Sequence, residues 1–101
     1  TENRDATLLA RQPPIMPSTA RRSGDCILSV AISPQGRVSR ILETDCTEDR
    51  FKEASIESVK AYRYLPKLVN GVPREGLDDD LLVTFQLADS RGQILPAKER
   101  T

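Results

Sequence analysis

The sequence predicts an α+β domain in which one principal helix packs on one face of a three-stranded antiparallel sheet. Two stretches in which apolar residues tend to alternate, separated by a short turn, predict a β-hairpin. A stretch with apolar residues at every third or fourth position follows, and a last apolar stretch completes the order strand, strand, helix, strand. An open sheet must bury one face, so this order favours a pair of layers, helix on sheet.

The chain of 101 residues fits one domain, which we expect to span residues 13–88. Residues 1–12 are mostly polar and are expected to form a flexible N-terminal extension. Residues 89–101 are charged and are expected to form a mobile tail in which only Ile94 and Leu95 can dock. No apolar run approaches the roughly 20 residues that span a bilayer. Because the chain begins at Thr1 rather than Met, we interpret it as a piece of a longer protein whose anchor would lie upstream.

The lead-in to the domain is rich in proline. Between residues 12 and 17 the prolines predict an extended segment, because proline has no N–H and fits neither a helix interior nor a sheet ladder. A short helical turn over residues 18–22 follows, with Ser18 as its cap and Gly24 at its end.

The hairpin comes next. Residues 26–33 alternate between apolar and smaller or polar side chains, which is typical of a half-buried strand. Pro34-Gln35-Gly36 predicts a turn, after which residues 37–43 are extended again. The apolar positions of this second strand do not alternate cleanly, and this indicates either a bulge or a strand with apolar contacts on both faces.

The helix is expected between residues 46 and 64, where one face is defined by three- and four-residue spacing. Thr47 is its expected N-cap, and Pro66 prevents its continuation. Turn-forming residues predict a loop over residues 67–79, and residues 81–87 form the third strand.

Charge and composition exclude several classes of function. Fifteen basic residues balance fifteen acidic ones, so the chain lacks the positive field of a nucleic-acid binder. The sequence contains no histidine, which removes the commonest metal ligand and the base of Ser-His and Cys-His sites. No serine stands in a G-x-S-x-G or S-x-x-K motif. We therefore expect no enzymatic activity, no cofactor, no metal site and no nucleic-acid partner.

The run Asp78-Asp79-Asp80 invites a metal interpretation, because hard cations prefer carboxylate oxygens. It lacks the spacing of a calcium loop, and successive side chains of an extended segment point in alternating directions. We favour a solvated loop, or charges that protect a strand edge from unwanted pairing.

Cys26 and Cys46 lie nearly equally far before and after the predicted turn, so the hairpin places them almost opposite each other. Nineteen residues separate them, a spacing that fits neither a C-x-x-C motif nor a zinc site. A disulfide is favoured over two separate thiols, and it would indicate an oxidising compartment. Nothing nearby suggests an activated, redox-active thiolate.

An open sheet of three strands has exposed edges whose unpaired N–H and C=O groups can pair with another chain. That chain is either an extended partner or a second copy in a homodimer. The sequence thus favours an interaction domain.

Short motifs along the chain support this interpretation through a family resemblance. They are Pro14-x-Met16-Pro17, Ala20, Pro34-Gln35-Gly36-Arg37-Val38, Phe51-x-x-Ala54, Val59, Tyr62-Arg63-Tyr64-x-Pro66, Asn70-Gly71 and Val83-x-Phe85-x-Leu87. This ordered set resembles the C-terminal domain of TonB-type energy transducers over about residues 13–88. The departures from the usual pattern are Met16 for Tyr, Gln35 for Asp, Tyr62 for Trp, Ser55 and Ser58 for Ala, and the two added cysteines.

The resemblance implies a periplasmic domain whose parent protein is anchored in the inner membrane and works with inner-membrane motor proteins. It implies binding of the TonB box of an outer-membrane transporter, which adds as a strand to the edge formed by the last strand. The partner-binding residues would be Asp80, Leu81, Leu82, Val83, Thr84, Phe85, Gln86 and Leu87, with Pro14, Ile15, Met16 and Pro17 of the lead-in near that edge. Two alternatives are a sensory or scaffold domain of another membrane protein and a small thiol enzyme.

Overall fold

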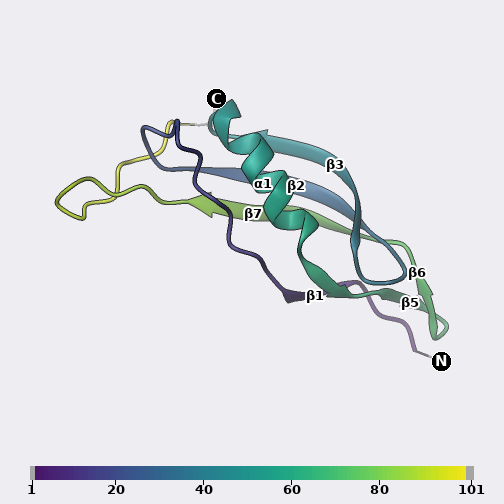
Figure 1. Ribbon diagram of the computed structural model, residues 1–101. Coiled ribbons are helices and arrows are strands. Elements are labelled where there is room, and N and C mark those ends of the chain that lie inside the picture. Colours follow the sequence, from purple (N-terminus) through teal and green to yellow (C-terminus); the bar gives the residue numbers. More distant parts are fainter. Residues whose placement is uncertain (1, 100–101) are drawn as a thin grey trace.

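The computed structural model describes residues 2–99 and contains a three-stranded antiparallel sheet crossed on one face by a helix (Figure 1). The strand order is β3-β2-β7, with β2 (Gly24–Ile32) in the centre, β3 (Val38–Cys46) on one side and β7 (Gly76–Phe85) on the other. This arrangement confirms the predicted α+β class and sheet.

The helical segment begins with a 3-10 turn, η1 (Asp49–Phe51), and continues as α1 (Lys52–Lys60). Thr47 is not its N-cap, contrary to the prediction. Its hydroxyl instead accepts a hydrogen bond from the N–H of Asp25 at 3.1 Å, so it serves the end of the hairpin. The N-cap position is held by Glu48, which makes no side-chain capping hydrogen bond.

The β2–β3 hairpin contains two irregularities, which confirms the predicted bulge. Ser29 pairs with Glu43 and Val30 with Ile41, so Leu42 is an extra residue in β3. Ser39 is a second extra residue, near the turn. Both bulges lie in β3, the edge strand of this pair.

The prediction of a loop over residues 67–79 is wrong in part. Asn70 and Gly71 form the tight turn of a small hairpin between β5 (Lys67–Val69) and β6 (Val72–Arg74). Their φ values of 51° and 76° are those that such two-residue turns require, and Asn-Gly favours them. The last strand also begins at Gly76, earlier than expected, and ends at Phe85.

The N-terminal segment differs from the expected flexible extension. β1 (Thr7–Ala10) pairs with β4 (Arg63–Leu65), and Arg4 exchanges backbone hydrogen bonds with Leu68. This pairing satisfies backbone groups of β4 that the main sheet leaves unpaired. Residue 1 lies outside the described residues.

Two shorter segments complete the chain. Residues 18–22 contain a turn in which the N–H of Ala20 donates to the carbonyl of Pro17, and not the expected helical turn. In the tail, the N–H of Leu95 donates to Leu87 at 2.8 Å, so this part of the expected mobile tail docks on the end of the domain. Residues 100–101 lie outside the described residues.

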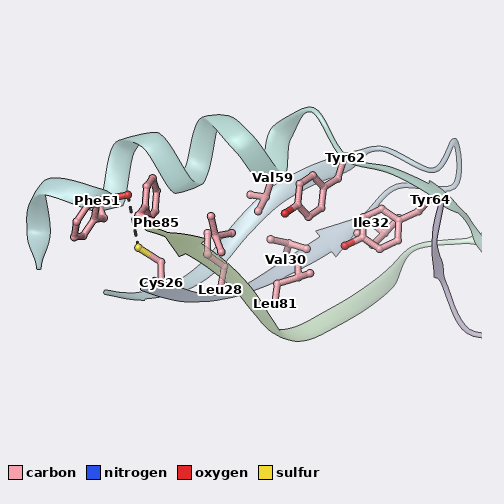
Figure 2. Packing of buried hydrophobic residues seen from close by; sticks show 11 residues of the cluster. Cys26, Leu28, Val30, Ile32, Phe51, Val59, Tyr62, Tyr64, Leu81 and Phe85 are labelled. Carbon is pink, nitrogen blue, oxygen red and sulfur yellow. Dashed lines mark hydrogen bonds between the residues drawn. The ribbon is translucent and has the colours of Figure 1, made fainter. Parts of the chain in front are cut away.

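The hydrophobic core lies between α1 and the sheet and is mostly aliphatic (Figure 2). The rings of Phe51 and Phe85 stack with their centroids 4.6 Å apart. The other buried members are Cys26, Leu28, Val30, Ile32, Val59, Tyr62, Tyr64, Leu81 and Val83.

Candidate interaction edge

The two outer strands of the sheet differ in how well they can accept another strand. β3 carries two bulges, and bulges blunt an edge by breaking the regular spacing of its N–H and C=O groups. β7 carries one irregularity, between its pairs with Leu28 and Val30, where Asp80 has a φ of 57°. Residues 81–85 beyond it are regular. The C-terminal half of β7 is therefore the better template for an added strand.

The backbone direction of this half of β7 follows from the disulfide at its neighbour β2. The Cα atoms of Cys26 and Cys46 are only 4.0 Å apart, which marks a pair that does not exchange backbone hydrogen bonds. In agreement, the carbonyl of Asp25 accepts from the N–H of Thr47 on the β3 side. The N–H and C=O of Cys26 must therefore point the other way, toward its partner Val83 on β7.

It follows that the backbone groups of Leu81, Val83 and Phe85 point inward to β2, while those of Leu82 and Thr84 point outward. A side-chain contact supports this orientation, because the Arg11 guanidinium donates to the carbonyl oxygen of Leu82 at 3.3 Å. The side chains of Leu82 and Thr84 are exposed, whereas the inward-facing residues are buried in the core.

The lead-in runs beside this edge after β1 (Figure 1). We call residues 11–17 the strap. Arg11, Gln12, Pro13 and Pro14 of the strap form one wall of a groove of about 320 Å³, and residues 82–84 of β7 form the other. Tyr62, which follows α1, completes the groove.

Side chains hold the strap in place. Arg11 donates to the hydroxyl of Tyr62 at 3.3 Å, and its guanidinium lies 5.5 Å from the centre of that ring. The buried hydroxyl of Ser58 on α1 donates to the carbonyl of Gln12. None of residues 11–17 takes part in a β-ladder.

The structure brings only some of the predicted site residues together. Pro14 lies at the groove with residues 82–84. Ile15, Met16 and Pro17 instead line a second hollow, between the strap and α1, where Ile15 is 83% exposed and Met16 packs against the core. Gln86 and Leu87 follow the end of β7, and Leu87 bonds to Ser23 and Leu95.

Three groove residues and Ser58, which lies outside the groove, were missed by the sequence prediction. Arg11 and Gln12 fell in the presumed extension, Tyr62 was named only among the family motifs, and Ser58 was given no role in binding. Tyr62 and Ser58 differ from the usual residues of the resembled family, and that difference was the available signal. No signal marked Arg11, because only the fold brings it to β7.

The predicted disulfide is confirmed, with an S–S distance of 2.05 Å between Cys26 and Cys46. Cys26 is fully buried beneath the aromatic pair, and its Sγ lies 3.6 Å from the carbonyl oxygen of Phe51 (Figure 2). The bridge fixes the pairing at the open end of the hairpin. It therefore also fixes which groups of β2 face β7.

The aspartate run does not act as a unit. Asp78 accepts a hydrogen bond from the hydroxyl of Tyr64 at 2.7 Å, and Asp80 sits at the irregularity of β7. Within residues 2–99, no three acidic or cysteine side chains gather in a way that could hold a metal ion. No helix in the described part of the chain is long and apolar enough to cross a membrane.

Comparison with known proteins agrees with this geometry. No curated protein sequence matches the chain significantly. The sequence model of the family described as Gram-negative bacterial TonB protein C-terminal matches residues 14–87, which is most of the chain and includes α1 and the whole β3-β2-β7 sheet. The chain therefore belongs to the TonB protein C-terminal family.

Proposed function

We propose that this chain is a periplasmic interaction domain of a TonB-like energy transducer and that it captures the TonB box of an outer-membrane transporter as an added strand on β7. The observation that carries the proposal is the regular, outward-facing half of β7, where Leu82 and Thr84 present their backbone groups to a groove. Family membership supports the choice of partner.

Strand addition explains how one edge binds an extended segment. An incoming strand pairs its N–H and C=O groups with those of Leu82 and Thr84, and these main-chain bonds supply affinity. Its alternate side chains face the groove beside Tyr62 or the exposed side chains of β7. The groove walls therefore select among sequences, while the ladder accepts any extended chain.

The same geometry suits the transmission of force. When the force acts along the strand, all backbone hydrogen bonds of the ladder bear it together. When the force peels one end of the strand away from the sheet, the bonds break one after another. β7 is held along its other side by β2, and β2 is tied to β3 by the disulfide. The proposed load would pass into a cross-linked sheet. The force itself would come from inner-membrane motor proteins that act through the parent protein.

A different partner is the second candidate, since Tyr62 stands in the groove where the resembled family usually has Trp. A smaller ring changes the shape of the wall that meets the ligand's side chains. The domain would then be a sensor or scaffold that uses the same edge for another extended segment.

A titration followed by NMR tests the proposal. The ¹⁵N-labelled chain is titrated with a synthetic peptide carrying the TonB box of a transporter from the same organism, and with a peptide of scrambled sequence. We expect the largest amide shifts at Leu82, Thr84 and Arg11 with the box peptide alone. No shifts at millimolar box peptide would refute the transporter as partner, and shifts confined to β3 would refute the β7 edge. Concentration-dependent shifts without peptide would indicate a homodimer.

A further inference from the structure

The strap lies across the groove from the β7 edge, and hydrogen bonds hold it to Tyr62, to Leu82 of β7 and to Ser58 of α1. We propose that the strap is a latch, closed in the free protein, that must open before a strand can be added to β7. This inference rests on the proposed function for its ligand, but the latch itself is a property of the free chain.

The first fastening competes directly with a ligand. The carbonyl of Leu82 is one of the outward acceptors that an added strand needs, and the guanidinium of Arg11 already donates to it. The same guanidinium contacts Tyr62 by a hydrogen bond and over its ring, so Arg11 bridges the two sides of the groove. An added strand would bring its own N–H to this carbonyl, so Arg11 has to share the acceptor or move away from β7.

The second fastening is the hydroxyl of Ser58. It is 3% exposed, and a buried hydroxyl is costly unless it is hydrogen-bonded. Serine inside a helix commonly bonds to a carbonyl of its own helix, as Ser55 does with Lys52 at 2.8 Å. Ser58 instead donates to Gln12 and thereby fixes the strap to α1.

The strap is also suited to open. Pro13 and Pro14 have no N–H, so the strap cannot replace its side-chain fastenings by a ladder with β7. The β1–β4 pairing ends at Ala10. Met16 packs against the core at the other end of the strap. The part of the strap between Ala10 and Met16 can therefore lift away from β7 while both of these points stay in place.

The latch predicts the direction in which affinity changes. When only the open form binds, the apparent dissociation constant equals the intrinsic one divided by the open fraction. Loosening either fastening raises that fraction, so binding becomes tighter. If the strap were merely a wall that contacts the ligand, loosening it would make binding weaker.

Two matched pairs of variants test the latch. Ser58→Ala removes the hydrogen bond to the strap. Ser55→Ala removes a hydroxyl from the same helix that bonds to Lys52 and not to the strap. Arg11→Gln removes the bridge across the groove, and Arg37→Gln changes an exposed arginine elsewhere. Thermal unfolding checks that each variant is folded.

Binding of the box peptide is the first measurement. We expect Ser58→Ala and Arg11→Gln each to bind up to about fivefold more tightly, the worth of one ordinary hydrogen bond, with both controls unchanged. Weaker or unchanged binding by the two variants would overturn the latch.

A second measurement needs no ligand. The ¹H–¹⁵N nuclear Overhauser effect of Gln12 and Ile15 should be that of ordered backbone in the unaltered chain and should fall in Ser58→Ala but not in Ser55→Ala. Equal values in the unaltered chain and in Ser58→Ala would show that the Ser58 hydroxyl does not restrain the strap. If neither the unaltered chain nor any variant binds the peptide, but Ser58→Ala loosens the strap as expected, the proposed ligand is wrong and the bond from Ser58 to the strap is confirmed.

Discussion

The hydroxyl of Tyr64 donates a hydrogen bond to Oδ2 of Asp78 over 2.7 Å, and this bond joins β4 to the start of β7. The ring of Tyr64 is buried, with 4% of its surface exposed. Burial and then the hydrogen bond to Asp78, helped by that carboxylate's charge, raise the pKa of Tyr64 well above its ordinary value of 10.0.

This raised pKa predicts a loss of stability in alkali. Above pH 10 the unfolded chain releases the Tyr64 proton while the folded chain keeps it, so the free energy of unfolding falls as pH rises. The slope from this one group is half of its limiting value at pH 10 and approaches about 1.4 kcal/mol per pH unit well above it. Urea unfolding between pH 9 and about pH 11 measures it. Tyr64→Phe should lose this share of the slope, and an identical slope in the variant would contradict the assignment.

Reduction of the disulfide should destabilise the domain without changing its fold. The bridge closes a loop with a sequence separation of 20, and the chain-entropy estimate for such a loop is about 3 kcal/mol. Urea unfolding of the oxidised and the reduced chain gives the difference directly. Labelling under unfolding, non-reducing conditions provides the control, since two reactive thiols would show that the bridge had not formed.

The orientation of β7 predicts opposite results for proline at adjacent positions. Thr84→Pro removes an outward N–H and should weaken peptide binding while the sheet persists, because proline is tolerated where the N–H faces solvent. Val83→Pro removes an N–H that faces Cys26 and should disrupt the β2–β7 ladder itself. Circular dichroism and peptide titration separate the two outcomes. A folded Val83→Pro that no longer binds would mean that the ladder is oriented the other way.

Close packing at the end of the sheet predicts that Gly24 resists substitution. A Cβ atom there would lie 2.2 Å from Cε2 of Phe51 and 2.6 Å from Oγ1 of Thr47. We expect Gly24→Ala to cost about 1–3 kcal/mol of stability, the usual range for overpacking. Phe51→Leu in the same chain should recover part of this loss, which a double-mutant cycle measures. Strictly additive effects would show that the ring is not the obstacle.

Periodicity alone was enough for the central part of the fold. The alternation in residues 26–33, the turn at Pro34-Gln35-Gly36 and the helical spacing that follows predicted the hairpin and α1, because each depends on a local pattern. The disulfide followed from the same hairpin geometry. The family could also be recognised from the order of short motifs.

Other parts were beyond a local pattern. The β5–β6 hairpin has strands of three residues each, too short for alternation to stand out from a loop. β1 has no signal of its own, since it exists only where β4 offers unpaired backbone groups. Thr47 has a side chain that can cap a helix, but in the folded chain its hydroxyl accepts a hydrogen bond from the N–H of Asp25 instead.

The three strands of the main sheet, the helix, the cross-link and the family of this protein could be predicted from side-chain periodicity and from motifs close together in the chain. Which residues of β7 face outward, and what lies beside them, depended on the tertiary structure. Backbone direction depends on register against β2, and the meeting of Arg11 with Leu82 joins residues 71 positions apart. Such contacts arise from the packing of whole elements, and no local pattern encodes them.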